Sequence, residues 1–94
     1  KVKEIQVNPK SRLSLQSHSK RSEVWTVIKG EALVTIDSET FLLKKNESAF
    51  IPAESMHRLE NQLEKPLSII EIQTGPILKE SDIIRFKDVY GRVN

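Results

Sequence analysis

Two short clusters hold the two histidines of this 94-residue chain. The first reads Gln16-Ser17-His18-Ser19-Lys20-Arg21-Ser22-Glu23, and the second reads Pro52-Ala53-Glu54-Ser55-Met56-His57-Arg58-Leu59-Glu60-Asn61. Imidazole nitrogens and carboxylate oxygens are ligands of transition metals, and a set of two His and one carboxylate leaves positions open for a substrate. These residue types therefore indicate a metal site made of His18, Glu23 and His57, if the fold brings the clusters together.

Side chains alternate between the two faces of a strand, so Gln16, His18 and Lys20 share one face of the strand expected in the first cluster. If that polar face is turned into a barrel, its polar atoms need partners, which a metal ion or an anionic ligand would supply. A simpler interpretation leaves His18 at the surface and lets His57 satisfy a buried backbone group, since isolated histidines often do one or the other.

The elements that must position these residues are strands. Short runs of β-branched or alternating apolar residues recur about every eight to twelve residues, with turn residues between them, which is typical of an all-β sandwich or barrel. Gly30-Glu31 and Asp37-Ser38-Glu39 are tight connections, so residues 24 to 44 are predicted to form a three-stranded antiparallel meander. The expected strands are residues 2–7, 13–18, 24–29, 32–37, 40–44, 49–51, 57–61 and 67–74, followed by a helical turn capped near Ser81 and Asp82 and a strand over 86–90.

The bulk properties describe a single soluble globular domain with 37% hydrophobic and 30% charged residues. The chain does not begin with Met, so we expect it to be a piece of a longer polypeptide. No apolar run approaches the ~20 residues of a membrane helix. The net charge of +2 is spread along the chain, which argues against nucleic-acid binding. The absence of cysteine excludes a disulfide framework and makes the cytoplasm the expected location.

The two clusters resemble the two motifs of the cupin superfamily. In the first motif a Glu is followed, after six residues, by a Gly, as Glu23 is followed by Gly30. The second motif has a Pro, a Gly, a His and an Asn at the spacing of Pro52, Glu54, His57 and Asn61, with Glu54 in the place of the Gly. The resemblance implies a cupin fold, which is a double-stranded β-helix or jelly-roll-like antiparallel barrel.

Longer stretches are similar to type II mannose-6-phosphate isomerase, a domain that typically forms the C-terminal part of bifunctional mannose-1-phosphate guanylyltransferases. The similarity runs from about Arg12 to Arg92 and includes Arg21-Ser22-Glu23-Val24-Trp25 and the closing Asp88-Val89-Tyr90-Gly91-Arg92. It implies one cupin domain over residues 1–94 and an N-terminal nucleotidyltransferase domain as its partner. The small size of the domain and its exposed strand edges also favour a homodimer.

The similarity implies interconversion of mannose 6-phosphate and fructose 6-phosphate, a reaction that feeds GDP-mannose and polysaccharide biosynthesis. Aldose–ketose exchange passes through an enediolate, so it needs a Lewis acid, a base and a cation for the phosphate. The implied ligands of a divalent ion of the zinc or cobalt class are His18, Glu23 and His57, with Gln16 as a fourth. Candidates for the substrate phosphate are Lys20, Arg21, Arg58 and Arg85, and no residue is assigned as the base.

The chain departs from this family in the first cluster. Relatives carry consecutive histidines where this chain has His18-Ser19-Lys20, and often another His at the position of Val24. The loss of imidazoles removes nitrogen ligands and Lys20 adds a cation, which weakens the case for metal. Two alternatives therefore stay open: a non-catalytic cupin module for assembly or sugar-phosphate binding, and a metal-free sugar-binding or epimerase-like cupin.

Overall fold

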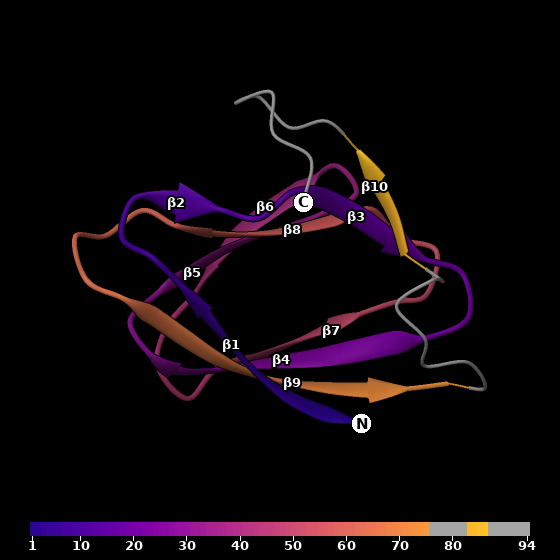
Figure 1. The fold of residues 1–94 in the computed structure, drawn as a ribbon, viewed down its shortest axis with the longest axis horizontal. Helices are drawn as coiled ribbons and strands as arrows, with labels where there is room; N and C mark the ends of the chain where they lie inside the picture. Colours follow the sequence, from indigo (N-terminus) through magenta and orange to yellow (C-terminus); the bar gives the residue numbers. More distant parts are fainter. Residues whose placement is uncertain (76–82, 87–94) are drawn as a thin grey trace.

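The computed structural model describes residues 1–75 and the backbone of residues 83–86, and every regular element in this part is a β-strand. The strands form two sheets that face each other (Figure 1). No helix of the described residues is long and apolar enough to cross a membrane. The strands are β1 (Val2–Val7), β2 (Ser11–Arg12), β3 (Leu15–His18), β4 (Ser22–Lys29), β5 (Ala32–Ile36), β6 (Glu39–Leu43), β7 (Ser48–Ile51), β8 (His57–Asn61), β9 (Leu67–Thr74) and β10 (Ile83–Phe86).

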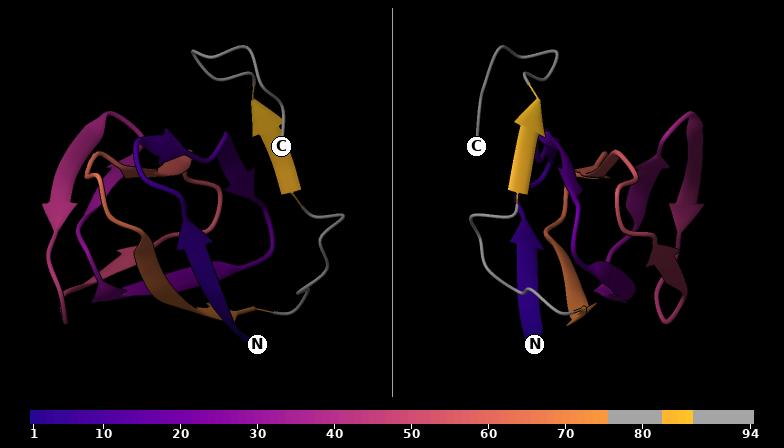
Figure 2. Two further views of the ribbon diagram at one scale, coloured as in Figure 1. Left: turned by 60° about the vertical axis from the view of Figure 1, so that its left-hand side comes forward. Right: turned by 90° about the vertical axis from the view of Figure 1, so that its right-hand side faces the viewer.

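The strand order differs from the order along the chain. One sheet has the order β1-β9-β4-β7, and the other has the order β10-β3-β8-β5-β6 with β2 beside β8. All pairings between strands of the described residues are antiparallel. The two sheets enclose the core as the halves of a flattened barrel (Figure 2), so the predicted all-β antiparallel barrel is confirmed.

The predicted meander over residues 24 to 44 is wrong in its first half. Strand β4 lies between β9 and β7, whereas β5 lies between β8 and β6, so the Gly30-Glu31 connection crosses from one sheet to the other. A bulge between Val27 and Lys29 and the left-handed φ of 88° at Gly30 turn the chain out of the first sheet. Only the second half, the β5–β6 hairpin, forms as expected.

Most strand positions agree with the sequence-based expectation to within two residues. The strand expected over residues 13–18 is shorter in the structure, where β3 covers Leu15–His18, and a short strand that was not expected, β2 at Ser11–Arg12, precedes it. Strands β2 and β3 pair with different parts of β8. The helical turn expected after Ser81 and Asp82 is wrong for residues 83–86, which form strand β10 because their backbone pairs with β3. Ser81 and Asp82 themselves lie outside the described residues, as does most of the strand expected over 86–90.

The core lies between the sheets, and its character changes along the strands. Inward residues such as Val27, Leu59 and Ile69 are almost fully buried, and each such side chain contributes about 1.5–3 kcal/mol of hydrophobic stabilisation. Towards one end of the same strands the inward residues become polar, as Glu23 on β4 and His57 on β8 show. The fold therefore places a buried polar cluster at one end of an apolar core.

Candidate metal centre

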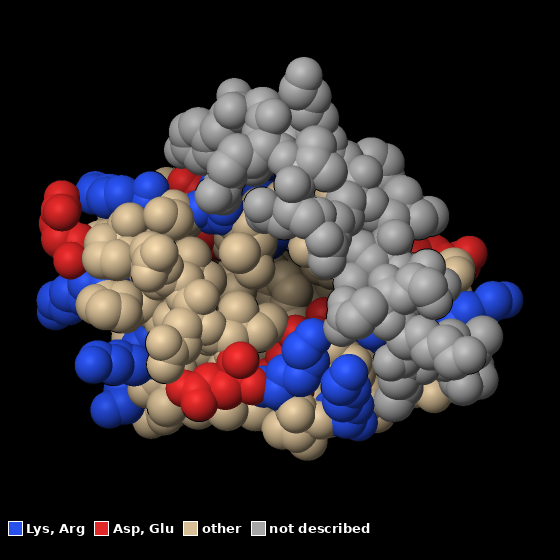
Figure 3. Space-filling model, in the orientation of Figure 1, with Lys and Arg blue, Asp and Glu red and all other residues tan. Residues whose placement is uncertain are grey.

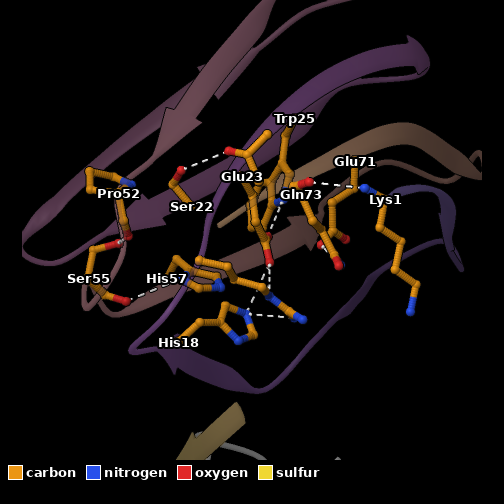
Figure 4. Close-up of polar contacts among 12 residues, drawn as sticks. Lys1, His18, Ser22, Glu23, Trp25, Pro52, Ser55, His57, Glu71 and Gln73 are labelled. Carbon is orange, nitrogen blue, oxygen red and sulfur yellow. Dashed lines mark hydrogen bonds and ion pairs between the residues drawn. The ribbon is translucent and has the colours of Figure 1, made fainter. Parts of the chain in front are cut away.

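Strand pairing across the barrel brings the two sequence clusters together. Strand β3 lies beside β8, with Gln16 opposite His57, and β4 of the other sheet brings Glu23 to them. The side chains of His18, Glu23 and His57 are 3%, 2% and 3% exposed, and one potential ligand atom from each lies within 4.8 Å of the other two. Figure 4 shows both imidazoles turned toward the Glu23 carboxylate between the sheets.

The turn between β7 and β8 ties the two clusters together through backbone contacts. Its chain reversal is held by Ser55, whose hydroxyl donates to the Pro52 carbonyl at 2.6 Å, and the amide of Glu54 donates to the His18 carbonyl at 2.6 Å. Glu54 has a φ of 69°, a left-handed conformation that costs a residue with a side chain about 1–2 kcal/mol. This conformation explains why the cupin motif has a glycine at that position.

Glu23 is the centre of the hydrogen-bond network. Its Oε2 atom lies 3.1 Å from Nε2 of His18 and accepts from Nε of Arg21 at 3.2 Å, while Oε1 accepts from Nε1 of Trp25 at 2.9 Å. Burial is the largest single effect and raises the pKa of Glu23, but the combined effects of His18, Glu71 and His57 outweigh it and lower the pKa to about 2. Glu23 is therefore ionised at neutral pH.

His57 is held in the form that a metal ligand requires. Its Nδ1 atom lies 3.2 Å from the Ser55 carbonyl, which can only accept, so Nδ1 carries the hydrogen and Nε2 keeps its lone pair. Burial lowers the pKa of His57 to about 4, against the opposing effect of the Glu23 charge. The ring is consequently neutral at pH 7.

Glu71 brings a second carboxyl group to the site, next to Glu23. Glu71 on β9 lies beside Glu23 and accepts a 2.7 Å hydrogen bond from Nε2 of Gln73. Burial and the negative charge of Glu23 raise the pKa of Glu71 to about 7. The sequence predicts that Glu71 and Gln73 share a face and are hydrogen-bonded if buried, but it does not assign Glu71 to the site, although strict alternation from the buried Leu67 and Ile69 points its side chain inward.

Arg21 contacts two of the three candidate ligands. Its guanidinium is buried, with Nε at 3.2 Å from Oε2 of Glu23 and Nη2 at 3.3 Å from Nε2 of His18. The chemistry of the donor set, two imidazoles and a carboxylate, fits a divalent ion. A positive guanidinium at the same atoms opposes a second cation, so Arg21 would have to move away for a divalent ion to bind.

A cavity of about 170 Å³ opens beside this cluster. Its lining within the described residues includes the candidate fourth ligand Gln16 and the phosphate candidate Arg58, together with Glu71 and Lys3, which sequence analysis did not assign to the site. Buried nitrogen atoms of His18 (Nδ1), Arg21 (Nη1) and Arg58 (Nη1) have no hydrogen-bond partner among the described residues. The two guanidinium nitrogens are donors, and unpaired buried donors beside one cavity indicate a ligand with acceptor oxygens.

The phosphate candidates Lys20 and Arg85 are not among the described side chains that line this cavity. Lys20 is exposed and does not line this cavity. The side chain of Arg85 lies outside the described residues, although its backbone pairs with that of Gln16 on β3.

Acidic and basic side chains are interspersed on the face shown in Figure 3, which is hollowed near its centre.

Comparison with known proteins gives one family and one fold. A family model described as mannose-6-phosphate isomerase C-terminal matches residues 1–88. Alginate biosynthesis protein AlgA of Pseudomonas aeruginosa is 55% identical over 97% of the chain, and mannose-1-phosphate guanylyltransferase ManC of Salmonella typhimurium is 49% identical over 98%. The chain spans 19% of the length of each of these relatives.

Solved structures support the fold. A Klebsiella pneumoniae protein with a double-stranded β-helix domain superposes with a TM-score of 0.79 at 18% identity, covering 93% of this chain and 74% of that chain. The cupin domain of Schizosaccharomyces pombe Cnp3 superposes with a TM-score of 0.76 at 12% identity, covering 79% and 54%. The predicted cupin fold and the predicted family resemblance are both confirmed.

Proposed function

The chain belongs to the mannose-6-phosphate isomerase C-terminal family, and on this premise we propose that it interconverts mannose 6-phosphate and fructose 6-phosphate. The convergence of His18, Glu23 and His57 beside a cavity is the observation that carries the proposal. The reaction moves hydrogen between two neighbouring carbons of the sugar. It therefore needs charge stabilisation for the enediolate and a group that moves a proton.

We assign His18, Glu23 and His57 as ligands of a divalent ion of the zinc or cobalt class, with Gln16 as the fourth ligand. Such an ion would act as a Lewis acid on the sugar oxygens. The neutral ring of His57 and the ionised carboxylate of Glu23 are already in the protonation states that ligation requires.

The remaining residues of the cavity bind the substrate and exclude water. Small-molecule sites usually measure ~300 Å³ or more, so a hexose phosphate fills this cavity of about 170 Å³ and extends to its mouth. Of the proposed phosphate-binding residues Lys20, Arg21, Arg58 and Arg85, both Arg21 and Arg58 line the cavity with a donor that lacks a partner. Arg58 is the better supported, because the Arg21 guanidinium already bonds to Glu23 and His18. Glu71 supplies a second carboxyl at the cavity wall.

The domain is proposed to work as part of a longer protein. The relatives are about five times as long as the region matched here, and their names include a mannose-1-phosphate guanylyltransferase and an alginate biosynthesis protein. We therefore expect a nucleotidyltransferase domain N-terminal to this one, and a role in GDP-mannose and polysaccharide biosynthesis. The expected cytoplasmic location rests on the absence of cysteine and of a long apolar run.

A second candidate function is favoured by the contacts of Arg21. Because this guanidinium already neutralises Glu23 and bonds to His18, the cluster is electrostatically satisfied without a metal. A cupin with such a site would serve as an assembly or sugar-phosphate-binding module.

One assay separates the two functions. The longer protein is freed of metal with a chelator, and fructose 6-phosphate formation from mannose 6-phosphate is followed with and without added Zn²⁺ or Co²⁺. Turnover restored by metal supports the isomerase. An absence of turnover with either metal, in a protein that remains folded and retains guanylyl transfer, rejects the isomerase in favour of the non-catalytic module.

A further inference from the structure

Trp25 contacts two of the three candidate metal ligands. Its Nε1 atom donates to Oε1 of Glu23 at 2.9 Å, and its ring meets the ring of His57 edge-on, with the ring centres 5.5 Å apart and the planes at 80°. Glu23 and Trp25 lie two residues apart on β4 and share its inner face, whereas His57 comes from β8 of the facing sheet. One side chain therefore connects ligands from both sheets (Figure 4).

The two oxygens of Glu23 have different partners. Oε2 lies 3.1 Å from Nε2 of His18 and accepts from Nε of Arg21 at 3.2 Å, so the guanidinium competes with an ion for this oxygen. Trp25 donates to the other oxygen, Oε1. A divalent ion that displaces Arg21 from Oε2 therefore leaves the hydrogen bond of the indole in place.

The chemistry of the indole suits it to hold a metal ligand. Its N–H group only donates and does not titrate, so the bond to Glu23 does not depend on protons or cations that the other neighbours of the carboxylate gain or lose. Trp25 is 4% exposed, so water does not compete for this N–H group. Hydrogen bonds to the ligands of a metal fix their orientation, and their removal typically lowers metal affinity about 10–100-fold.

We propose that Trp25 is a positioning residue of the candidate metal centre, which holds Oε1 of Glu23 so that Oε2 alone is presented to the ion. The inference rests on the proposed isomerase function, since it requires an ion at His18, Glu23 and His57. A Trp25 that served only the core would need the carboxylate merely as a partner for its own N–H group. Loss of that group would then leave metal binding unchanged.

Replacement of Trp25 by Phe tests the proposal, because it keeps an aromatic ring and removes the N–H group. The protein is freed of metal with a chelator and titrated with Zn²⁺ and Co²⁺ by isothermal titration calorimetry. We expect Trp25→Phe to bind either ion about 10–100-fold more weakly than the wild type. The matched control is Val27→Ala. Val27 is fully buried on the same face of β4 and does not line the cavity, so its replacement removes core contacts and should leave the affinity unchanged.

The visible absorption of bound Co²⁺ is a readout that a loss of packing alone does not move. Tetrahedral Co²⁺ absorbs more strongly than Co²⁺ with a larger number of ligand atoms. In Trp25→Phe the Glu23 carboxylate is free to turn and offer both oxygens, so we expect weaker bands than in the wild type and in Val27→Ala.

A measurement on the wild type tests the proposal even if Trp25→Phe does not fold. The chain has one tryptophan, so its indole gives one signal in a ¹H–¹⁵N NMR spectrum. We expect this signal to keep the chemical shift of a hydrogen-bonded N–H group when Zn²⁺ is bound.

Four results would overturn the inference. The first is an unchanged affinity or an unchanged Co²⁺ spectrum in Trp25→Phe, and the second is an equal loss of affinity in Trp25→Phe and Val27→Ala. The third is an indole signal that moves to the position of a free N–H group when Zn²⁺ binds, and the fourth is a wild type that takes up neither ion.

The isomerase assay keeps this inference apart from the proposed function. Turnover that added metal restores, together with any of the first three results, leaves the isomerase standing and rejects the role of Trp25. The expected behaviour of Trp25→Phe in a protein without turnover rejects the isomerase and leaves the role of Trp25 standing.

Discussion

Arg21 and Glu23 form a buried ion pair within the candidate metal centre, with Nε of Arg21 at 3.2 Å from Oε2 of Glu23. Arg21 directly precedes β4 and Glu23 is the second residue of that strand. Both side chains are less than 4% exposed. The same carboxylate oxygen lies 3.1 Å from the ring of His18. The guanidinium of Arg21 therefore already contacts the Glu23 oxygen that a divalent ion would need as a ligand.

Replacement of Arg21 by Met should increase metal affinity. The substitution removes a positive charge beside Glu23 while it keeps most of the apolar volume of the side chain, so we expect Zn²⁺ or Co²⁺ to bind at least about tenfold more tightly. Isothermal titration calorimetry of the chelator-treated protein measures the affinity.

The matched control for that experiment is Arg12→Met. Nη1 of Arg12, on β2, lies 3.9 Å from Oε1 of Glu60, and Arg12 does not line the cavity. Its replacement should therefore leave metal affinity unchanged. Equal affinities for the wild type and the Arg21→Met variant, with both proteins folded by circular dichroism, would show that Arg21 does not compete with the ion.

Replacement of His57 by Ala should abolish metal uptake. His57 is neutral and buried, and the Ser55 carbonyl holds its ring in one tautomer, so it is a prepared ligand. Loss of one of three protein ligands should reduce the affinity by more than about a hundredfold, since even residues that only support a ligand change it 10–100-fold. Metal content after dialysis, measured by atomic emission, should fall to background, and unchanged content would remove His57 from the site.

The positions of the strands could be predicted from the sequence because the signals are local. Alternation identifies residues 57–61 and 67–74, which are β8 and β9 with the same bounds. Strand pairing depends on contacts between distant segments. A short Gly30-Glu31 connection is compatible both with a hairpin and with a crossing between sheets, so the sequence could not show that β4 and β5 lie in different sheets.

The convergence of the candidate ligands was predictable, whereas the position of Arg21 was not recognised. The spacing of the two clusters indicated that His18, Glu23 and His57 would meet, and the structure brings them together. Arg21 was assigned to the substrate phosphate, although alternation with Glu23 and Trp25 places it on the inner face. Whether an inward Arg contacts a carboxylate or a substrate depends on the distance to the facing sheet, which sequence patterns do not contain.

Replacement of Glu71 by Gln should change how stability depends on pH. The pKa of Glu71 is raised to about 7 in the folded chain, mainly by burial, against an ordinary value near 4.5. Its stabilising contribution is therefore complete below pH 4.5 and is lost as the pH rises through 7. The amide stays neutral, so the stability difference in favour of Glu71→Gln should grow by about 1–3 kcal/mol between pH 5 and pH 8.

Urea unfolding of the metal-free protein at both pH values measures this difference. Glu64→Gln is the control, because the Glu64 side chain is 85% exposed and should give the same difference from the wild type at both pH values. The pKa values of Glu23 and His57 are lowered to about 2 and about 4, so their stabilising contributions are lost toward acid. Glu23 stays ionised from pH 5 to pH 8, and the contribution of His57 is present in both proteins. A difference that does not change between pH 5 and pH 8 contradicts the raised pKa.

Replacement of Asn61 by Ala should destabilise the fold. Asn61 is 1% exposed, and its Nδ2 donates to the carbonyls of Val7, Asn8 and Lys65 at 3.1, 3.2 and 2.6 Å. Its Oδ1 accepts from the amide of Leu63 at 3.0 Å. Alanine leaves these backbone groups without partners at the end of β8, so we expect a loss of about 2–4 kcal/mol in the free energy of unfolding.

The neighbouring residue provides the control for Asn61, since Gln62 is exposed and Gln62→Ala should change stability by less than about 0.5 kcal/mol. Because Asn61 joins the end of β1 to the turn after β8, its loss should also speed hydrogen exchange at the Leu63 amide, which then bonds only to water. A stability loss for Asn61→Ala as small as that for Gln62→Ala would mean that water replaces the amide, and that the cupin Asn is not required to hold these two segments together.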